Sequence, residues 1–252
     1  ELNRVWNETY MSAAMESILT GYDDPRLKVY FETCTDKAYA GEYRGIRQGT
    51  CFAHNHYAGL SKLSVDQSTD APLMSSAEVW FLRAEAALRG FSNETPKTCY
   101  ETGIKTSFAQ WGVGDATNYL ASDKKPSDYK EMVPASGGKD MKALITISPK
   151  WNDTAGKEGQ LEQIITQKWL ACWPESYEAW SEQRRTGYPK LFKVQTNNSG
   201  GTIDTNDMIR RLPFSTDDAD KDPVQYDLLK KALGGPDHGG TRLWWDAGKN
   251  NF

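Results

Sequence analysis

The segment Leu161–Leu191 constrains the fold most, because it predicts two helices joined at a fixed break. Pro174 cannot continue the first helix, since it lacks an N–H and its ring clashes with the preceding turn. A second helix is predicted from Glu175 and ends at Gly187, which Pro189 follows. The apolar face of the first helix is predicted to consist of Leu161, Ile165, Trp169, Cys172 and Trp173. One stripe of the second helix is predicted to hold Tyr177, Trp180 and Arg184. The three tryptophans of this segment indicate a packing centre.

Helical periodicity recurs in the N-terminal half of the chain. A helix is predicted over Asn3–Leu19, with a stop at Gly21 and an apolar ladder of Trp6, Tyr10, Ala14 and Ile18. Ser75–Gly90 is predicted as a second helix, because Ser75 and Glu78 form a capping box and Gly90 is a C-terminal stop. A third helix is predicted on the apolar stripe Tyr100, Ile104, Phe108 and Trp111. The last two helices together have the size of one tetratricopeptide-like hairpin.

Composition sets limits on the class of protein. With 252 residues the chain can bury one substantial core or two small ones. A mean hydropathy of -0.69 and the lack of a long apolar run exclude a transmembrane helix. The net charge is -4, and lysines and arginines are scattered, so nucleic-acid binding is not expected. Residues 142–148, KALITIS, are the only run typical of a β-strand.

The four cysteines are widely spaced and include no C-x-x-C pair, so no zinc ribbon or redox motif is predicted. Cys99 and Cys172 fall in helical patterns and are expected to be buried. Cys34 and Cys51 flank one loop region and are candidates for a disulfide in an exported protein.

Two patterns are suggestive of metal binding. His54 and His56, with Cys51 nearby, lack a clear fourth ligand. The acidic run from Asp217 to Asp222 lacks the glycine and distal glutamate of an EF-hand loop, and a helix N-terminus explains it more simply. We therefore expect neither a metal nor a cofactor.

Catalytic motifs are missing from the sequence: it has no G-x-S-x-G elbow, P-loop, H-E-x-x-H or dinucleotide-binding glycine pattern. No acidic residue stands out as half of a glycosidase pair. We therefore do not expect an enzyme. The arginine pairs Arg184–Arg185 and Arg210–Arg211 suggest an anion site, but they are expected to hold helix C-termini and buried carboxylates instead.

Several long stretches resemble the SusD/RagB family of nutrient-binding outer-membrane lipoproteins. In chain order they are SSAEVWFLRAEAALRG at Ser75–Gly90, QKWLACWPESYEAWSEQRRTGYPKL at Gln167–Leu191, IRRLPFS at Ile209–Ser215 and LGGPDHGGTRLWWD at Leu233–Asp246. The turn at Asp23–Pro25 is similar to a turn that the family carries before its ligand-facing region. The resemblance covers the C-terminal part of the family only. The chain begins at Glu1 without a signal peptide or lipobox, so we expect it to be the C-terminal part of a longer chain.

The resemblance implies a mainly α fold, with a SusD-like helical scaffold, tetratricopeptide-like helix pairs, long irregular loops and little β structure. It implies a single SusD-like domain over residues 1–252, with helical scaffold at 75–112 and 160–252. It implies an outer-membrane location on the extracellular face, with membrane contact only through a lipid anchor that is absent from this chain. The implied function is binding of a glycan or oligosaccharide, without catalysis, and its delivery to a SusC-like TonB-dependent transporter.

Residues 30–71 are predicted as the ligand-facing segment, because helical periodicity disappears there among glycines and aromatics. Aromatic rings can stack on the apolar faces of sugar rings. From their place in these loops, the candidate ligand-binding residues are Tyr39, Tyr43, His54 and Tyr57. The alternative is that these tyrosines merely pack over the helical core. Alternative functions are a helical-repeat module that binds protein and no sugar, binding of a peptide nutrient, and an accessory role in glycan hydrolysis.

Overall fold

A computed structural model describes residues 8–246, 248 and 250–252, without the side chains of residues 54 and 218. The helices in order are α1 (Ala13–Gly21), α2 (Leu27–Tyr30), η1 (His54–Tyr57), α3 (Ser76–Arg89), α4 (Pro96–Gln110), α5 (Thr117–Leu120), η2 (Pro134–Ser136), α6 (Gly156–Ala171), α7 (Ser176–Thr186), α8 (Thr216–Lys221) and α9 (Pro223–Leu233). The part of the chain that the structure describes contains isolated β-bridges and no strand. Its fold is therefore mainly helical, as the sequence predicts.

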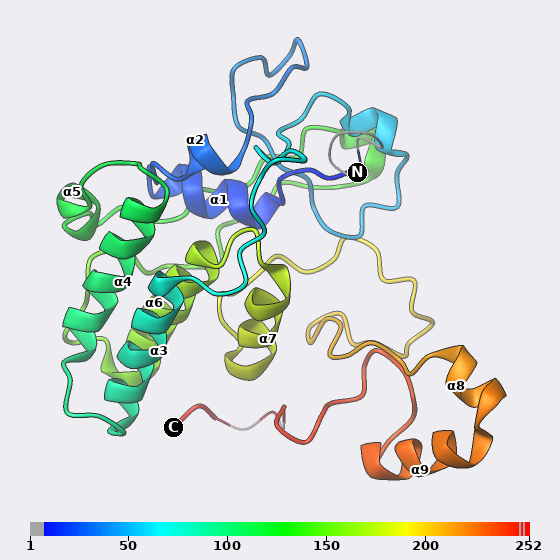
Figure 1. Ribbon diagram of the computed structural model, residues 1–252. Helices are drawn as coiled ribbons and strands as arrows, with labels where there is room; N and C mark the ends of the chain where they lie inside the picture. The colour runs from blue at the N-terminus through cyan, green and yellow to red at the C-terminus, as the bar shows by residue number, and fades with distance from the viewer. Residues whose placement is uncertain (1–7, 247, 249) are drawn as a thin grey trace. The chain divides into compact units, whose positions relative to one another are not determined.

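The chain forms two compact units, Glu1–Phe192 with Phe252, and Lys193–Asn251. In the first unit α3, α4 and α6 pack side by side, and α7 follows α6 (Figure 1). None of the helices in the described ranges has the length and apolar character needed to cross a bilayer. The single-domain organisation expected from the sequence stays a prediction.

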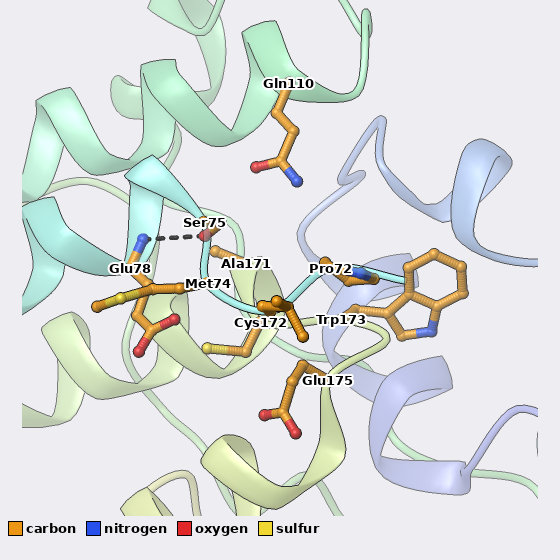
Figure 2. A pocket seen from close by; sticks show the side chains of 10 residues that line it. Pro72, Met74, Ser75, Glu78, Gln110, Ala171, Cys172, Trp173 and Glu175 are labelled. Atoms are coloured by element: carbon orange, nitrogen blue, oxygen red, sulfur yellow. Dashed lines mark hydrogen bonds between the residues drawn. The ribbon is translucent and has the colours of Figure 1, made fainter. Parts of the chain in front are cut away.

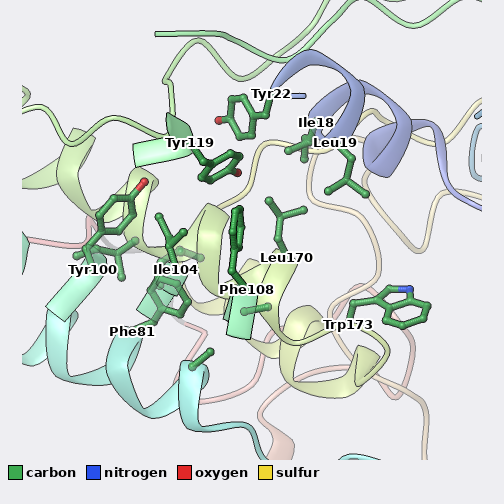
Figure 3. Close-up of a cluster of buried hydrophobic side chains, with 14 of the residues drawn as sticks. Ile18, Leu19, Tyr22, Phe81, Tyr100, Ile104, Phe108, Tyr119, Leu170 and Trp173 are labelled. Atoms are coloured by element: carbon green, nitrogen blue, oxygen red, sulfur yellow. The ribbon is translucent and has the colours of Figure 1, made fainter. Parts of the chain in front are cut away.

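The α3–α4 hairpin has the predicted caps. The Ser75 hydroxyl accepts the Glu78 N–H at 3.1 Å, and Gly90 ends α3 with a φ of 80°. Gly103 lets α4 approach α3 closely, because a Cβ there would lie 2.8 Å from the Phe81 ring. The predicted stripe of α4 is buried at Tyr100, Ile104 and Phe108, as Figure 3 shows. The predicted hairpin is confirmed.

The break between α6 and α7 lies where the sequence predicts it: α6 ends at Ala171, before Pro174, and α7 begins at Ser176. The Glu175 carboxylate accepts the N–H groups of Tyr177 and Glu178, and Gly187 ends α7 with a φ of 78°. However, α6 is buried on nearly all sides rather than on one face: Gln163, Thr166, Gln167 and Lys168 are as buried as the predicted apolar residues. The predicted stripe of α7 is partly wrong, because Tyr177 is 71% exposed. The reason is that α6 packs against α3, α4 and α7, while Tyr177, in the first turn of α7, faces solvent.

The first predicted helix begins later than its periodicity suggests. Helix α1 starts at Ala13, because the Ser12 hydroxyl accepts the Met15 N–H at 3.2 Å and caps it. Just before the cap, the Met11 N–H donates to Ser61 O at 2.8 Å, so this backbone pairs with a distant loop. Trp6 lies outside the described residues.

The strand predicted over residues 142–148 does not form. The adjacent Met141 makes a single antiparallel bridge with Tyr129. Side chains of the helices take the carbonyls that a neighbouring strand would otherwise take: Tyr22 donates to Ile147 O at 3.1 Å, and Gln163 donates to Ser148 O at 3.1 Å. Two carbonyls at the end of this segment are therefore satisfied by side chains of the helical scaffold and not by a neighbouring strand.

Charges, rather than apolar side chains, hold the described part of the second unit together. The Arg210 guanidinium forms a bidentate pair with Asp246, at 2.6 and 2.7 Å, and both side chains are almost fully buried. Arg211 pairs with Asp237 in the same unit. Asp222 caps α9 by accepting the Gln225 N–H at 3.0 Å, so the predicted helix N-terminus is confirmed. Trp244, in the family-like stretch Leu233–Asp246, is 91% exposed.

Candidate functional site

The loop-rich segment 30–71 is irregular except for η1, and its base is fixed to the helical unit. Phe31 bridges Leu63, and Ser12 at the start of α1 bridges Ile46. Within the segment, the Cys34 N–H donates to Glu42 O at 2.7 Å and closes a loop around Tyr39. The loop that carries Tyr39 is therefore closed at both ends, and Tyr43 follows it directly.

Tyr39 lies at the edge of the second apolar cluster, which includes Cys34, Leu60 and Met132. Its ring is partly exposed, and its hydroxyl is 3.5 Å from Met132 O. The Arg44 guanidinium carbon lies 5.4 Å from the centre of the ring. One face of the ring thus has a cation beside it, while part of the ring remains open to solvent.

Tyr43 packs against the main apolar cluster instead of the second one. Its side chain is half-buried, and burial raises the pKa of its hydroxyl above the ordinary value. Tyr39 and Tyr43 are thus close in sequence but rest on different clusters, so they are two separate half-exposed rings.

Tyr57 is a core residue. Its side chain is 3% exposed, it belongs to the second apolar cluster, and its hydroxyl contacts the Thr50 hydroxyl. A buried ring offers no open face to a sugar, so this residue fits the alternative of packing. The backbone of His54 begins η1, and its side chain lies outside the described part of the chain.

The sequence interpretation missed Arg44 and Glu16, which meet beneath Tyr39. The Arg44 Nε lies 3.3 Å from Glu16 Oε1, and Glu16 Oε2 accepts the Gly45 N–H at 2.6 Å. Burial raises the pKa of Glu16 to about 7, although the Gly45 N–H and Arg44 oppose that shift. Arg44 directly follows Tyr43, which was the only available signal in the sequence. A contact between the exposed His56 ring and the half-buried Phe52 ring, whose centres lie 4.2 Å apart, was not predicted either.

A shallow hollow, too small for a sugar ring, lies where α3, the end of α4 and the α6–α7 junction meet. Figure 2 shows Glu78 and Glu175 facing it with Cys172 between them. Its lining residues are Pro72, Leu73, Met74, Ser75, Glu78, Gln110, Ala171, Cys172, Trp173 and Glu175, none of them basic. Burial raises the pKa of Cys172 to about 12, so its sulfur is a neutral thiol at physiological pH.

The other predicted features have clear structural positions. Cys34 is buried, Cys51 is exposed, and no disulfide joins them. Arg185 lies 2.6 Å from Glu85 and 2.7 Å from Glu182, so its predicted role with buried carboxylates is confirmed. Arg184 stacks on Trp180, with its guanidinium carbon 3.6 Å from the ring centre. Within the described ranges, no three His, Cys, Asp or Glu side chains gather as a metal site.

Comparison with known proteins finds one family model that matches nearly the whole chain. The family model described as SusD-like, "Susd and RagB outer membrane lipoprotein", matches residues 2–246. A SusD homologue from Bacteroides vulgatus is 58% identical with a TM-score of 0.92, over 98% of this chain and 51% of that one. A chitin-binding SusD homologue from Flavobacterium johnsoniae is 41% identical with a TM-score of 0.94, over 100% of this chain and 52% of that one. A SusD homologue from Bacteroides thetaiotaomicron is 34% identical with a TM-score of 0.90, over 97% of this chain and 53% of that one.

These solved structures are about twice as long as the chain, which spans about half of each. No curated protein matches it. The predicted resemblance and the SusD-like helical scaffold are confirmed.

Proposed function

Because the chain belongs to the SusD/RagB family of outer membrane lipoproteins, we propose that it binds a glycan or oligosaccharide without catalysis. The observation that carries this proposal is the family match over residues 2–246. The family is known for glycan binding at the cell surface. We further propose that the whole protein lies on the extracellular face of the outer membrane and delivers its ligand to a SusC-like TonB-dependent transporter.

The proposed ligand face consists of the half-exposed rings Tyr39 and Tyr43, together with His54. An aromatic ring can cover the C–H face of a pyranose, while neighbouring amide, carboxylate and guanidinium groups bond its hydroxyls. Each ring packs against an apolar cluster, Tyr39 on the second and Tyr43 on the main one, so little conformational entropy is lost when a sugar stacks on them. Tyr57, which is 3% exposed, supports this loop from within.

Oligomers of β-linked N-acetylglucosamine are the first ligand class to test. The relative from Flavobacterium johnsoniae, at 41% identity, is chitin-binding. Pyranoses with equatorial substituents present two flat apolar faces, which suit stacking on tyrosine. The acetamide group adds one donor and one acceptor that distinguish this sugar from glucose.

The experiment is retardation on native gels cast with soluble polysaccharides, followed by calorimetric titration with chito-oligosaccharides. We expect the double variant Tyr39→Ala/Tyr43→Ala to bind at least tenfold more weakly, with an almost unchanged unfolding midpoint. Tyr177→Ala is the matched control, because that tyrosine is 71% exposed on α7, away from the loop. If the double variant binds as tightly as the parent, the proposed ligand face is wrong. If no glycan binds the parent, the carbohydrate proposal fails.

A protein-binding module is the second candidate, favoured by exposed apolar side chains elsewhere on the first unit. Leu73 is 92% exposed and Phe91 is 80% exposed, which is unusual for large apolar side chains. Glycan titration separates the two functions, because a protein-binding module would bind a partner with no sugar present. A protein that binds a peptide nutrient would show no binding in either glycan experiment. An accessory of glycan hydrolysis would be recognised by the release of reducing ends.

A further inference from the structure

Arg44 connects the ring of Tyr39 to a buried carboxylate. Its Nη2 donates to Lys130 O at 3.2 Å, and its Nε lies 2.9 Å from the Met132 sulfur. Its side chain is 18% exposed, so several neighbours fix the guanidinium and little of it reaches solvent. Tyr39 and Arg44 both contact Met132, one through its carbonyl and the other through its sulfur.

Glu16 holds this arrangement from the α1 side. Its two carboxylate oxygens have separate tasks, since Oε2 accepts the Gly45 N–H at 2.6 Å and Oε1 lies 3.3 Å from the Arg44 Nε. A second acidic contact to Arg44, from Glu42 at 3.4 Å, comes from a side chain that is 54% exposed. The buried contact therefore fixes Arg44 more firmly than the exposed one.

We propose that Arg44 is a positioning residue for the ligand face: while Glu16 is ionised, Arg44 holds the Tyr39 ring in its stacking orientation, and protonation of Glu16 releases that hold. This inference rests on the proposed glycan-binding function. The contact is direct on both sides, with the guanidinium carbon 5.4 Å from the ring centre and Nε 3.3 Å from the carboxylate. Neither Arg44 nor Glu16 needs to touch the sugar.

The charged groups around Glu16 determine the pH at which its carboxylate is protonated and Arg44 is no longer fixed by it. Arg44 favours the ionised carboxylate, whereas Glu42, on the same loop as Arg44, and Glu131, on the segment after Tyr129, disfavour it. Burial also disfavours the charge, and the pKa of Glu16 rises to about 7. Affinity for a stacked sugar should therefore fall as the pH is lowered from 8 to 6. The expected change is about threefold to tenfold, the range that a cation–π contact accounts for.

The test follows Tyr39 directly by ¹⁹F NMR of the chain labelled with 3-fluorotyrosine, with its resonance assigned by its absence in Tyr39→Phe. In the parent this resonance should shift with a midpoint near pH 7. In Glu16→Gln it should stay near its acidic position at every pH. In Arg44→Met it should be displaced and insensitive to pH, and Arg44→Lys should restore part of the parent shift. Glu42→Gln is the matched control: its Tyr39 resonance should still titrate, with a midpoint below that of the parent, because the substitution removes a negative charge that disfavours ionised Glu16.

Glycan affinity is then measured for the same variants at pH 6 and pH 8. The pH dependence should be present in the parent and in Glu42→Gln, and absent in Glu16→Gln. A Tyr39 resonance that does not titrate, or that titrates equally in Glu16→Gln, overturns the positioning role whether or not a sugar binds. If the resonance behaves as expected and no glycan binds at either pH, the proposed function fails and the positioning of Tyr39 stands.

Discussion

The Arg26 guanidinium forms a bidentate pair with the Asp24 carboxylate, at 2.9 and 2.6 Å, and both side chains are fully buried. The same guanidinium donates to Ser107 on α4 and to Gln167 on α6. The Asp–Pro–Arg turn is therefore joined to helices α4 and α6. The resemblance associates a turn of this type with a ligand-facing region, but here its charged side chains lie in the interior.

Replacing Arg26 with Met should lower the free energy of unfolding by about 3–5 kcal/mol, because it leaves the Asp24 carboxylate buried without its cation. Urea unfolding measures the change. Lys142→Met is the matched control, since Lys142 and Asp128 form an exposed pair that water and salt screen, so its loss should change stability much less. Equal losses in the two variants would contradict the buried-pair interpretation.

Tyr57→Ala should destabilise the chain by about 3 kcal/mol, because it removes a buried ring from the second apolar cluster. Tyr177→Ala should change stability by less than about 0.5 kcal/mol, because that ring is largely in solvent. Thermal unfolding of the two variants provides the comparison. A Tyr57→Ala protein as stable as the parent would mean that Tyr57 is not a core residue.

Glu16 should make stability depend on pH in an uncommon direction for a carboxylate. Its folded pKa of about 7 lies above its usual value of 4.5, so the folded chain holds a proton that the unfolded chain has released. The stability gained from that proton is complete below about pH 4.5 and is lost as the pH rises through about 7. Relative to Glu16→Gln, the parent should therefore lose on the order of 2 kcal/mol between pH 5 and pH 8. Urea unfolding at the two pH values measures this difference, and a parallel response in both proteins would disprove the assignment.

Gly103→Ala should destabilise the α3–α4 hairpin by about 1–3 kcal/mol, although alanine is the better helix former. The new methyl group would lie 2.8 Å from the Phe81 ring. Adding Phe81→Leu should recover part of the loss, because a smaller side chain makes room for the methyl group. A double-mutant cycle on the unfolding free energy tests this, and simple additivity of the two changes would rule out the predicted clash.

Local signals in the sequence were sufficient for the boundaries of α3 and α7. The caps at Ser75, Gly90, Glu175 and Gly187 depend on bonds within a few residues, so the sequence alone carries the information. The start of α1 was missed, because the backbone before Ser12 pairs with residues 46 and 61, far along the chain. Residues 142–148 look like a strand, but side chains of distant helices bind their carbonyls.

The candidate site was less predictable than the helices. An irregular loop has no period that fixes which side chains point inward, so Tyr57 was indistinguishable from Tyr39 by position. Arg44 gave no signal beyond its place next to Tyr43. Its role depends on the contact with Glu16, and a helical pattern places Glu16 on α1 without showing which residue it contacts. The family explains the scaffold, whereas the contacts beneath Tyr39 follow only from the folded chain.

The described part of the second unit, Lys193–Asn251, contains buried ion pairs in place of an apolar core, and this has a consequence for hydrogen exchange. No described residue between 193 and 251 belongs to either apolar core cluster, and helix α9 has no buried residue. Opening such a unit exposes little new apolar surface, so it costs less free energy than opening the helices around α6. Deuterium should therefore enter the backbone amides of α8 and α9 well before those of α6, while the scaffold beneath the candidate site stays closed.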